Sequence, residues 1–269
     1  MMAKLDQTED SGPRPRSSMT RQPFLTRLSC TDLIFEGGHS SKPSRVRKNT
    51  DIIIAGNRHK SIYANHDGWL FRYKILRSGC RQIVDFILPG EIFGLQACLF
   101  RSSLYSVATI TDASLTAIPA TTIDDVFARS PQLSKALFWS AVCEAAILGE
   151  HLTDAGRRTA YERISHLMLE LFVRLSSAGL ARDMSFRMPL TQELIGDALG
   201  LTTIHVNRTL RSLREDGLIA IHGKSVTIRD FDTLSLLCDF EHCYLSGSVH
   251  SLRNKTASPV GSDGCLLWG

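Results

Sequence analysis

The residues best suited to chemistry gather in one stretch, LTTIHVNRTLRSLREDGL, from residue 201 to residue 218. At about 100° per residue, a helix through this stretch places Val206, Leu210 and Leu213 within about 60° of one another. These three side chains form an apolar stripe that predicts a buried face. The opposite face carries arginine, asparagine, histidine and one isoleucine.

That polar face has the chemistry needed to contact the edges of DNA bases. An arginine such as Arg208 can form two parallel hydrogen bonds to guanine, and Asn207 can pair in the same way with adenine. Ile204 can touch a thymine methyl group, and His205 can contact a base or a phosphate. The alternative is a solvated, charged face on an ordinary amphipathic helix.

The neighbouring segments indicate which element holds this face. Thr191 is placed to cap a preceding short helix, and Gly200 suits the position after its last turn, where a positive φ is favoured. Thr202 is placed to cap the next helix. The following run LIAIHGKSVTIRD predicts a β-hairpin around Gly223. Two short helices and a hairpin predict a winged helix–turn–helix.

The rest of the chain divides into a β-rich part and a helical part. Between residues 45 and 118, short runs such as WLFRYKIL and RQIVDFIL alternate with turn residues, which predicts an antiparallel barrel or sandwich. After Pro131 the apolar spacing becomes helical, with helices expected over 132–152 and 159–175 and a loop over 176–189. A shorter helix is expected over 24–37.

Composition excludes several classes of protein. The chain has 269 residues, is 43% hydrophobic and 22% charged, and carries a net charge of +4, which fits one or two folded domains. We expect a cytoplasmic protein with no membrane partner, because no apolar run suits a membrane span or a secretory signal.

No motif of an enzyme is found, so no catalytic residue is predicted. The seven cysteines lack the spacing of a zinc site or a disulfide framework: Cys30, Cys80, Cys98, Cys143, Cys238, Cys243 and Cys265.

Two motifs make the chain resemble the bacterial Crp/Fnr family of transcription regulators: GWLFRYKILRSGCRQIVDFILPGEIFG and LTQELIGDALGLTTIHVNRTLRSLREDGLIAIHGKSVTI. The resemblance runs from about residue 25 to residue 235. It implies an α+β fold with an N-terminal cyclic-nucleotide-binding-like β-barrel, a long dimerisation helix and a C-terminal winged helix–turn–helix. The expected divisions are a disordered arm (1–22), a sensory domain (23–130), the dimerisation helix (131–155), the DNA-binding domain (156–235) and a C-terminal tail (236–269).

The resemblance also assigns residues. Base-reading positions fall on Thr203, Ile204, His205, Asn207 and Arg208, and Ile204 stands where many members have Glu. Phosphate contacts are expected from Thr191, Gln192, Thr202, Arg211 and Lys224. Candidates for the dimer seam are Leu137, Ala141, Ala145, Leu148 and Leu152, with packing onto their own domain as the alternative. Glu144 and His151 on the same helix are expected to be solvated.

The region that binds cyclic nucleotide in some members departs from their pattern. In PGEIFGLQACLFRSSLYSVATI, the acidic position that contacts ribose falls on Leu95 or Gln96, and Tyr105-Ser106 replaces the Arg-Ser pair that holds the phosphate. The candidate effector pocket is therefore Glu91, Tyr105 and Ser106, and no cyclic nucleotide is expected. An iron–sulfur cluster is not expected either, since Cys30 alone precedes residue 80. No cofactor or metal is evident.

These observations predict a homodimeric, sequence-specific DNA-binding transcription regulator that reads a palindromic operator with helix 202–214. Its expected partners are double-stranded DNA and a second copy of the chain, with RNA polymerase as a further candidate. The alternative function is a ligand-binding sensory module whose helical domain contacts a protein rather than DNA.

Overall fold

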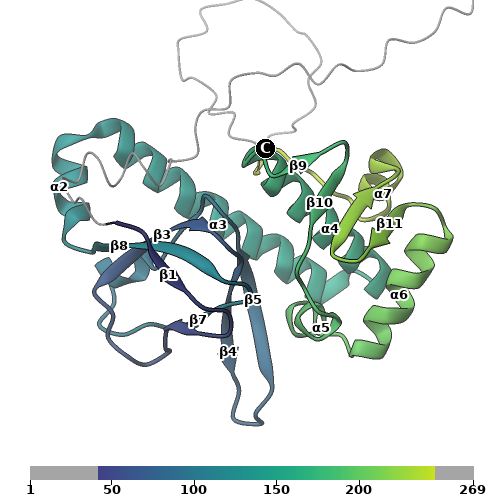
Figure 1. The fold of residues 1–269 in the computed structure, drawn as a ribbon, viewed down its shortest axis with the longest axis horizontal. Helices are drawn as coiled ribbons and strands as arrows, with labels where there is room; N and C mark the ends of the chain where they lie inside the picture. Colours follow the sequence, from purple (N-terminus) through teal and green to yellow (C-terminus); the bar gives the residue numbers. More distant parts are fainter. Residues whose placement is uncertain (1–41, 246–269) are drawn as a thin grey trace, which may run out of the picture.

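The computed structural model describes residues 42–245. The predicted arm over 1–22, the predicted helix over 24–37 and the end of the tail beyond residue 245 lie outside the described residues, as do Cys30 and Cys265. Within the described part, an N-terminal β domain is followed by two long helices and a small winged domain (Figure 1). None of the helices between residues 42 and 245 is long and apolar enough to cross a membrane.

The N-terminal domain consists of two four-stranded antiparallel sheets that face one another. One sheet has the order β1-β8-β3-β6: β1 (Ser44–Val46), β8 (Ala113–Pro119), β3 (Ser61–Asp67) and β6 (Ile92–Phe93). The other has the order β2-β7-β4-β5: β2 (Asp51–Ile53), β7 (Ser106–Thr109), β4 (Leu70–Ile75) and β5 (Arg81–Ile87). A short 3₁₀ helix, Leu95–Cys98, follows β6.

The sheets do not close into the β-barrel that the family resemblance implied, and the sandwich alternative from the strand pattern is confirmed. The two sheets form a jelly-roll-like sandwich whose shared core includes Leu70, Ile87, Phe93 and Leu115. The edge strands β1, β2 and β6 are only two or three residues long, so they are too short to carry a continuous hydrogen-bond ladder from one sheet to the other. β4 is a strand as predicted, but its side chains do not alternate between buried and exposed: Leu70, Phe71 and Arg72 are all buried, and Lys74 and Ile75 are exposed.

Three helices connect the two domains. α2 (Thr122–Arg129) packs against the first sheet, and α3 (Pro131–Arg157) begins with Ser130 as its cap and a proline in its first turn. α4 (Ala160–Ser177) begins with a capping box, in which Thr159 and Glu162 satisfy each other's backbone N–H groups. The predicted long helices are thus confirmed, and α3 lies behind the sandwich and leads into the winged domain (Figure 1).

The winged domain contains more regular structure than the sequence predicted. α5 (Gln192–Leu199), α6 (Thr203–Glu215) and the hairpin of β11 (Ile219–His222) and β12 (Ser225–Ile228) are confirmed. The expected loop over 176–189 instead holds a hairpin of β9 (Ala181–Arg182) and β10 (Ser185–Arg187), which joins the wing in a sheet of order β11-β12-β10-β9. α7 (Phe231–Leu237) was also missed, and it crosses the expected boundary at residue 235.

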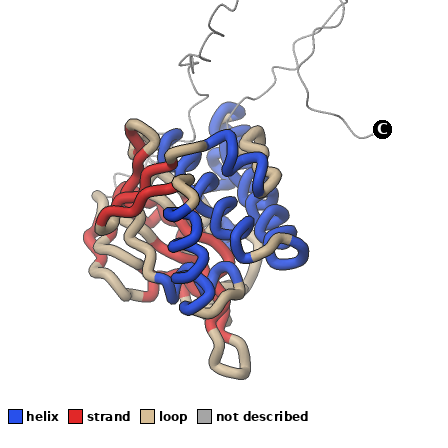
Figure 2. The backbone as a smooth tube through the Cα atoms, turned by 90° about the vertical axis from the view of Figure 1, so that its right-hand side faces the viewer, coloured by secondary structure: helices blue, strands red, loops and turns tan. Residues whose placement is uncertain are grey.

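The two domains meet along strand β5. It lies at the edge of its sheet, and α3, α4 and α5 all contact it. Arg81 at the start of β5 pairs with Asp197 of α5 at 2.7 Å and also reaches Glu193 at 3.3 Å. The tip of the β4–β5 hairpin projects beyond the rest of the molecule in both views (Figure 1, Figure 2).

Candidate nucleic-acid interface

The turn between α5 and α6 is built by its caps and glycines. The Thr191 hydroxyl accepts a hydrogen bond from the Leu194 N–H, and the Thr202 hydroxyl accepts one from the His205 N–H. Gly200 has φ +67°, as the C′ position requires. A Cβ at Gly196 would lie 2.5 Å from the Leu201 carbonyl oxygen, so this position needs glycine for the helices to approach. The capping and turn predictions are confirmed.

The apolar side of α6 fixes the helix against the domain. Val206 and Leu213 are fully buried and Leu210 is nearly so, as predicted. α6 also contacts α4, whose Tyr161 hydroxyl donates to Asp216 at 2.7 Å. Because one side of α6 is held in this way, the orientation of its opposite side is set by the fold.

The opposite side of α6 faces solvent. All five predicted base-reading residues are exposed there: Thr203, Ile204, His205, Asn207 and Arg208. Ile204 is 79% exposed. The structure therefore brings the five residues together on the first two turns of α6.

The candidate phosphate contacts come from the starts of α5 and α6, from α6 itself and from the wing. Thr191 and Thr202 cap α5 and α6 by accepting from the Leu194 and His205 N–H groups, and the start of a helix suits an anion because its other first-turn N–H groups have no partner within the helix. Gln192 is half-exposed beside Thr191. Arg211 pairs with Glu215 at 2.7 Å, but both side chains are mostly exposed, so this ion pair costs little to exchange for a phosphate.

Lys224 projects from the tip of the wing. Gly223, with φ +60°, forms the turn before it, and the Met188 N–H donates to the Lys224 carbonyl at 2.7 Å. Ser185 of β10 also hydrogen-bonds Thr227 of β12 at 2.7 Å. The additional hairpin β9–β10 therefore holds the wing in place, and the short polar strands that form it gave little signal in the sequence.

Comparison with known proteins identifies this arrangement. Residues 43–130 match the family model of the cyclic nucleotide-binding domain, and residues 162–237 match that of the Crp-like helix–turn–helix domain. The anaerobic regulatory protein of Haemophilus influenzae is 30% identical over 190 residues, which are 70% of this chain and 73% of that relative. The chain belongs to the Crp/Fnr family of transcription regulators. Members of this family are DNA-binding regulators and not enzymes.

Two further comparisons agree with this family assignment. The regulatory protein HlyX of Actinobacillus pleuropneumoniae is 28% identical over 192 residues, covering 71% of this chain and 79% of that protein. The solved structure of FixK2 from Bradyrhizobium japonicum matches with a TM-score of 0.66 at 27% identity, covering 73% of this chain and 96% of that one.

The long helix of this regulator presents an apolar strip to solvent. Phe138, Val142, Ala145, Gly149 and Leu152 are all exposed and follow one another at alternating steps of four and three residues. This is the spacing of a coiled-coil seam. We refer to these five residues as the α3 seam.

The α3 seam differs in part from the predicted one. Leu137 is buried against its own domain, among Ile62, Ile123 and Leu133, so its assignment to the seam is wrong. Its neighbour Phe138 is instead 71% exposed. Ala145 and Leu152 lie in the α3 seam, and Ala141 and Leu148 flank it.

The predicted effector pocket is not a single site. Ser106 is buried, and its hydroxyl accepts a hydrogen bond from the Ala55 N–H at 2.9 Å. Tyr105 stacks beneath the Lys74 ammonium, 5.1 Å from its ring centre. Glu91 instead binds Arg174 of α4. The three residues therefore do not converge.

A different cavity lies between the second sheet and α3. Its volume is about 60 Å³, and its lining includes Arg72, Asp85, Glu91, Trp139 and Glu144, but neither Tyr105 nor Ser106. Arg72 is buried and pairs with Glu144, so the expectation that Glu144 is solvated is wrong. The sequence pattern missed this pair because its members are 72 residues apart.

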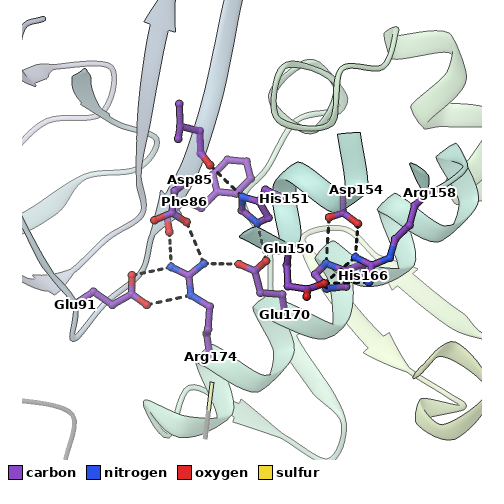
Figure 3. Close-up of polar contacts among 11 residues, drawn as sticks. Asp85, Phe86, Glu91, Glu150, His151, Asp154, Arg158, His166, Glu170 and Arg174 are labelled. Carbon is purple, nitrogen blue, oxygen red and sulfur yellow. Dashed lines mark hydrogen bonds and ion pairs between the residues drawn. The ribbon is translucent and has the colours of Figure 1, made fainter. Parts of the chain in front are cut away.

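The junction between the domains is a buried cluster of charges (Figure 3). The His151 ring bonds the Val84 carbonyl at 3.1 Å and the Glu170 carboxylate at 2.7 Å, so the expectation that His151 is solvated is also wrong. Burial lowers the pKa of His151, but the Glu170 carboxylate more than offsets this and raises the pKa to about 9. Burial raises the pKa of Glu170, but His151 and Arg174 beside it lower the pKa to about 2. His151 and Glu170 are therefore both charged at neutral pH.

A second cluster lies beside the first, where α3 ends and α4 begins. Arg158 pairs with Asp154 at 2.8 Å and with Glu150 at 3.0 Å. His166 of α4 is fully buried, 3.2 Å from Asp154 and 3.4 Å from Glu150 (Figure 3). These contacts join the last turns of α3 to α4.

Proposed function

We propose that this regulator is a homodimer that reads a palindromic operator, with one α6 helix in each of two major grooves. The observation that carries this proposal is the solvent-facing side of α6, where Arg208, Asn207, His205 and Ile204 stand on a helix fixed from behind by Val206 and Leu213. Two such helices related by a two-fold axis would meet half-sites about 34 Å apart.

Dimerisation is assigned to the α3 seam. Its heptad spacing and its exposed Phe138 and Leu152 suit a parallel pair of helices. Ala145 and Gly149 within it are small, which permits a close approach of the two helices. Pairing two α3 helices would also bury apolar surface that is otherwise in contact with water.

The base contacts follow from side-chain chemistry. Arg208 is assigned to a guanine and Asn207 to an adenine, because each can form two hydrogen bonds to that base. Ile204 can neither donate nor accept a hydrogen bond, so it is assigned to a thymine methyl group. Operators preferred by relatives with Glu at this position would therefore bind this regulator less well. Thr191, Gln192, Thr202, Arg211 and Lys224 are assigned to phosphates.

The cavity beside α3 is small for a nucleotide ligand. A pocket for a molecule of nucleotide size typically measures about 300 Å³ or more, and the cavity beside α3 is about 60 Å³. Its two arginines face three carboxylates: Asp85, Glu91 and Glu144. These facts support a regulator that does not bind a cyclic nucleotide, and we expect neither an iron–sulfur cluster nor another cofactor. A cytoplasmic location and a contact with RNA polymerase are proposed from family membership.

Selection of bound sequences from a random DNA pool tests the proposal. We expect enriched sequences to share an inverted repeat with guanine, adenine and thymine in each half-site. The Ile204→Glu variant, selected in parallel, should replace thymine by cytosine at one position per half-site and leave the other positions unchanged. Enrichment of no sequence, or binding that does not weaken steeply with salt, would contradict the proposal and favour the alternative in which the winged domain contacts a protein.

A further inference from the structure

Arg174 links the two domains through a complete set of hydrogen bonds. It belongs to the winged-domain segment of the chain, residues 162–237, whereas Asp85, Phe86 and Glu91 belong to the sensory segment, residues 43–130. Its side chain is 2% exposed. The guanidinium is therefore a winged-domain group that is buried against the sensory domain (Figure 3).

Every N–H of that guanidinium has an acceptor. Nε and Nη2 donate to the two carboxylate oxygens of Glu91, at 3.1 and 2.8 Å, in the forked geometry specific to arginine. Nη1 donates to Asp85 at 3.2 Å and to Glu170 at 2.6 Å. Nη2 also donates to the Phe86 carbonyl at 2.5 Å. Since arginine has five N–H donors, none is left over.

The same contacts close the free edge of the sensory sheet. Strand β5 is an edge strand, and an edge strand has backbone carbonyls without a partner strand. The carbonyl of Phe86 accepts from Arg174, and that of Val84 accepts from His151. The winged-domain helix α4 and the dimer helix α3 are thus both attached to this one strand.

We propose that Arg174 is a positioning residue for operator binding, which sets the orientation of each winged domain relative to the sensory domain and the α3 seam. This inference rests on the proposed function, because it concerns a dimer that binds two half-sites at once. When the two α6 helices are held at a fixed separation and angle, binding of the second half-site loses little further conformational entropy. Without the Arg174 contacts, each winged domain turns more freely about the junction at Arg158 and Thr159. Binding to the operator must then fix its orientation, and the entropy lost in doing so lowers the affinity.

The test measures how strongly the protein discriminates half-site spacing. The full-length dimer is titrated onto the selected operator and onto versions with one, two or three base pairs inserted between the half-sites. For the wild type, each insertion moves and rotates one half-site, so affinity should fall at least tenfold at the least favourable spacing. For Arg174→Met, affinity for the original spacing should fall about tenfold, and the loss caused by insertions should shrink to about threefold or less.

Arg174→Lys covers the case in which Arg174→Met fails to fold. Lysine keeps the positive charge among the carboxylates, but its single nitrogen cannot make the fork to Glu91 while also reaching Phe86. We expect the same loss of spacing discrimination. The control is Leu234→Ala, which weakens the packing of α7 in the winged-domain core without touching the sensory domain, and it should discriminate spacing as the wild type does.

The outcomes separate the two proposals. If the wild type discriminates spacing and a folded Arg174 variant discriminates equally well, Arg174 has no positioning role and this inference fails alone. If the wild type is indifferent to spacing, binding does not use two fixed half-sites and the proposed function fails as well.

Discussion

Leu152 provides the sharpest measurement of the proposed dimer. It is 75% exposed at one end of the α3 seam, and full burial of a leucine side chain contributes about 1.5–3 kcal/mol. Burying its exposed three quarters would then contribute roughly 1–2 kcal/mol in each subunit. Since a two-fold interface contains two copies, Leu152→Ala should weaken dimerisation by about 2–4 kcal/mol, which raises the dimer Kd roughly 30- to 700-fold.

Analytical ultracentrifugation over a range of concentrations measures this change. Leu236→Ala is the matched control, because Leu236 is 81% exposed but lies on α7, away from the α3 seam. It should leave the Kd unchanged. A change of less than threefold for Leu152→Ala in a folded protein, or an equal change for Leu236→Ala, would refute the assignment of the dimer contact to α3.

Two further predictions concern the junction and the turn. His151 has its pKa raised from 6.5 to about 9, so it stabilises the fold fully below pH 6.5 and loses this effect as pH rises through 9. Urea unfolding should therefore show wild type more stable than His151→Gln by about 3 kcal/mol at pH 5.5, with the gap closing by pH 9.5; a gap that is constant or widens with pH contradicts the charged pair with Glu170. Gly196→Ala should destabilise the protein by about 1–3 kcal/mol, because its Cβ would meet a backbone oxygen, whereas Gly156→Ala, with nothing within 4 Å, should change thermal stability by less than about 1 kcal/mol. Equal melting temperatures for the two glycine variants would show that the turn adapts.

The exposed polar face of α6 was predictable because it depends on local spacing. The buried positions of Val206, Leu210 and Leu213, and the caps at Thr191 and Thr202, all lie within about two turns of the residues that they orient. The spacing of apolar residues along the sequence predicts directly which residues of a helix are buried and which are exposed. The strands of the sandwich were also predictable from a local pattern, the short runs separated by turn residues. Whether the two sheets close into a barrel depends instead on contacts between strands that are distant in the sequence.

The junction was not predictable, because its partners are distant in the sequence. Arg174 and Asp85 are 89 residues apart, and Arg72 and Glu144 are 72 apart. A local signal did exist, since Glu170 and Arg174 interrupt the buried face of α4 at a spacing of four residues. A charged pair on an apolar face indicates a buried partner, although it does not identify which one.

The error at Leu137 has a simple cause. α3 has apolar residues on two adjacent sides, one covering its own domain through Leu133 and Leu137 and the other exposed through Phe138 and Leu152. A single sequence shows both sets at helical spacing, and only the position of the sheets distinguishes them. An offset of one residue therefore separates an intramolecular contact from the α3 seam.

The central claim, that α6 reads DNA, is tested most directly by the affinity of Arg208→Ala for the selected operator at fixed salt. Loss of a forked contact to guanine costs about 1–3 kcal/mol in each half-site, so affinity should fall at least 30-fold for the two-site operator while the dimer stays folded. Arg214→Ala removes the same charge from the last turn of α6, and it should reduce specific affinity by less than about fivefold. Equal affinities of wild type and Arg208→Ala, or equal losses in the two variants, would contradict recognition of the operator by this face.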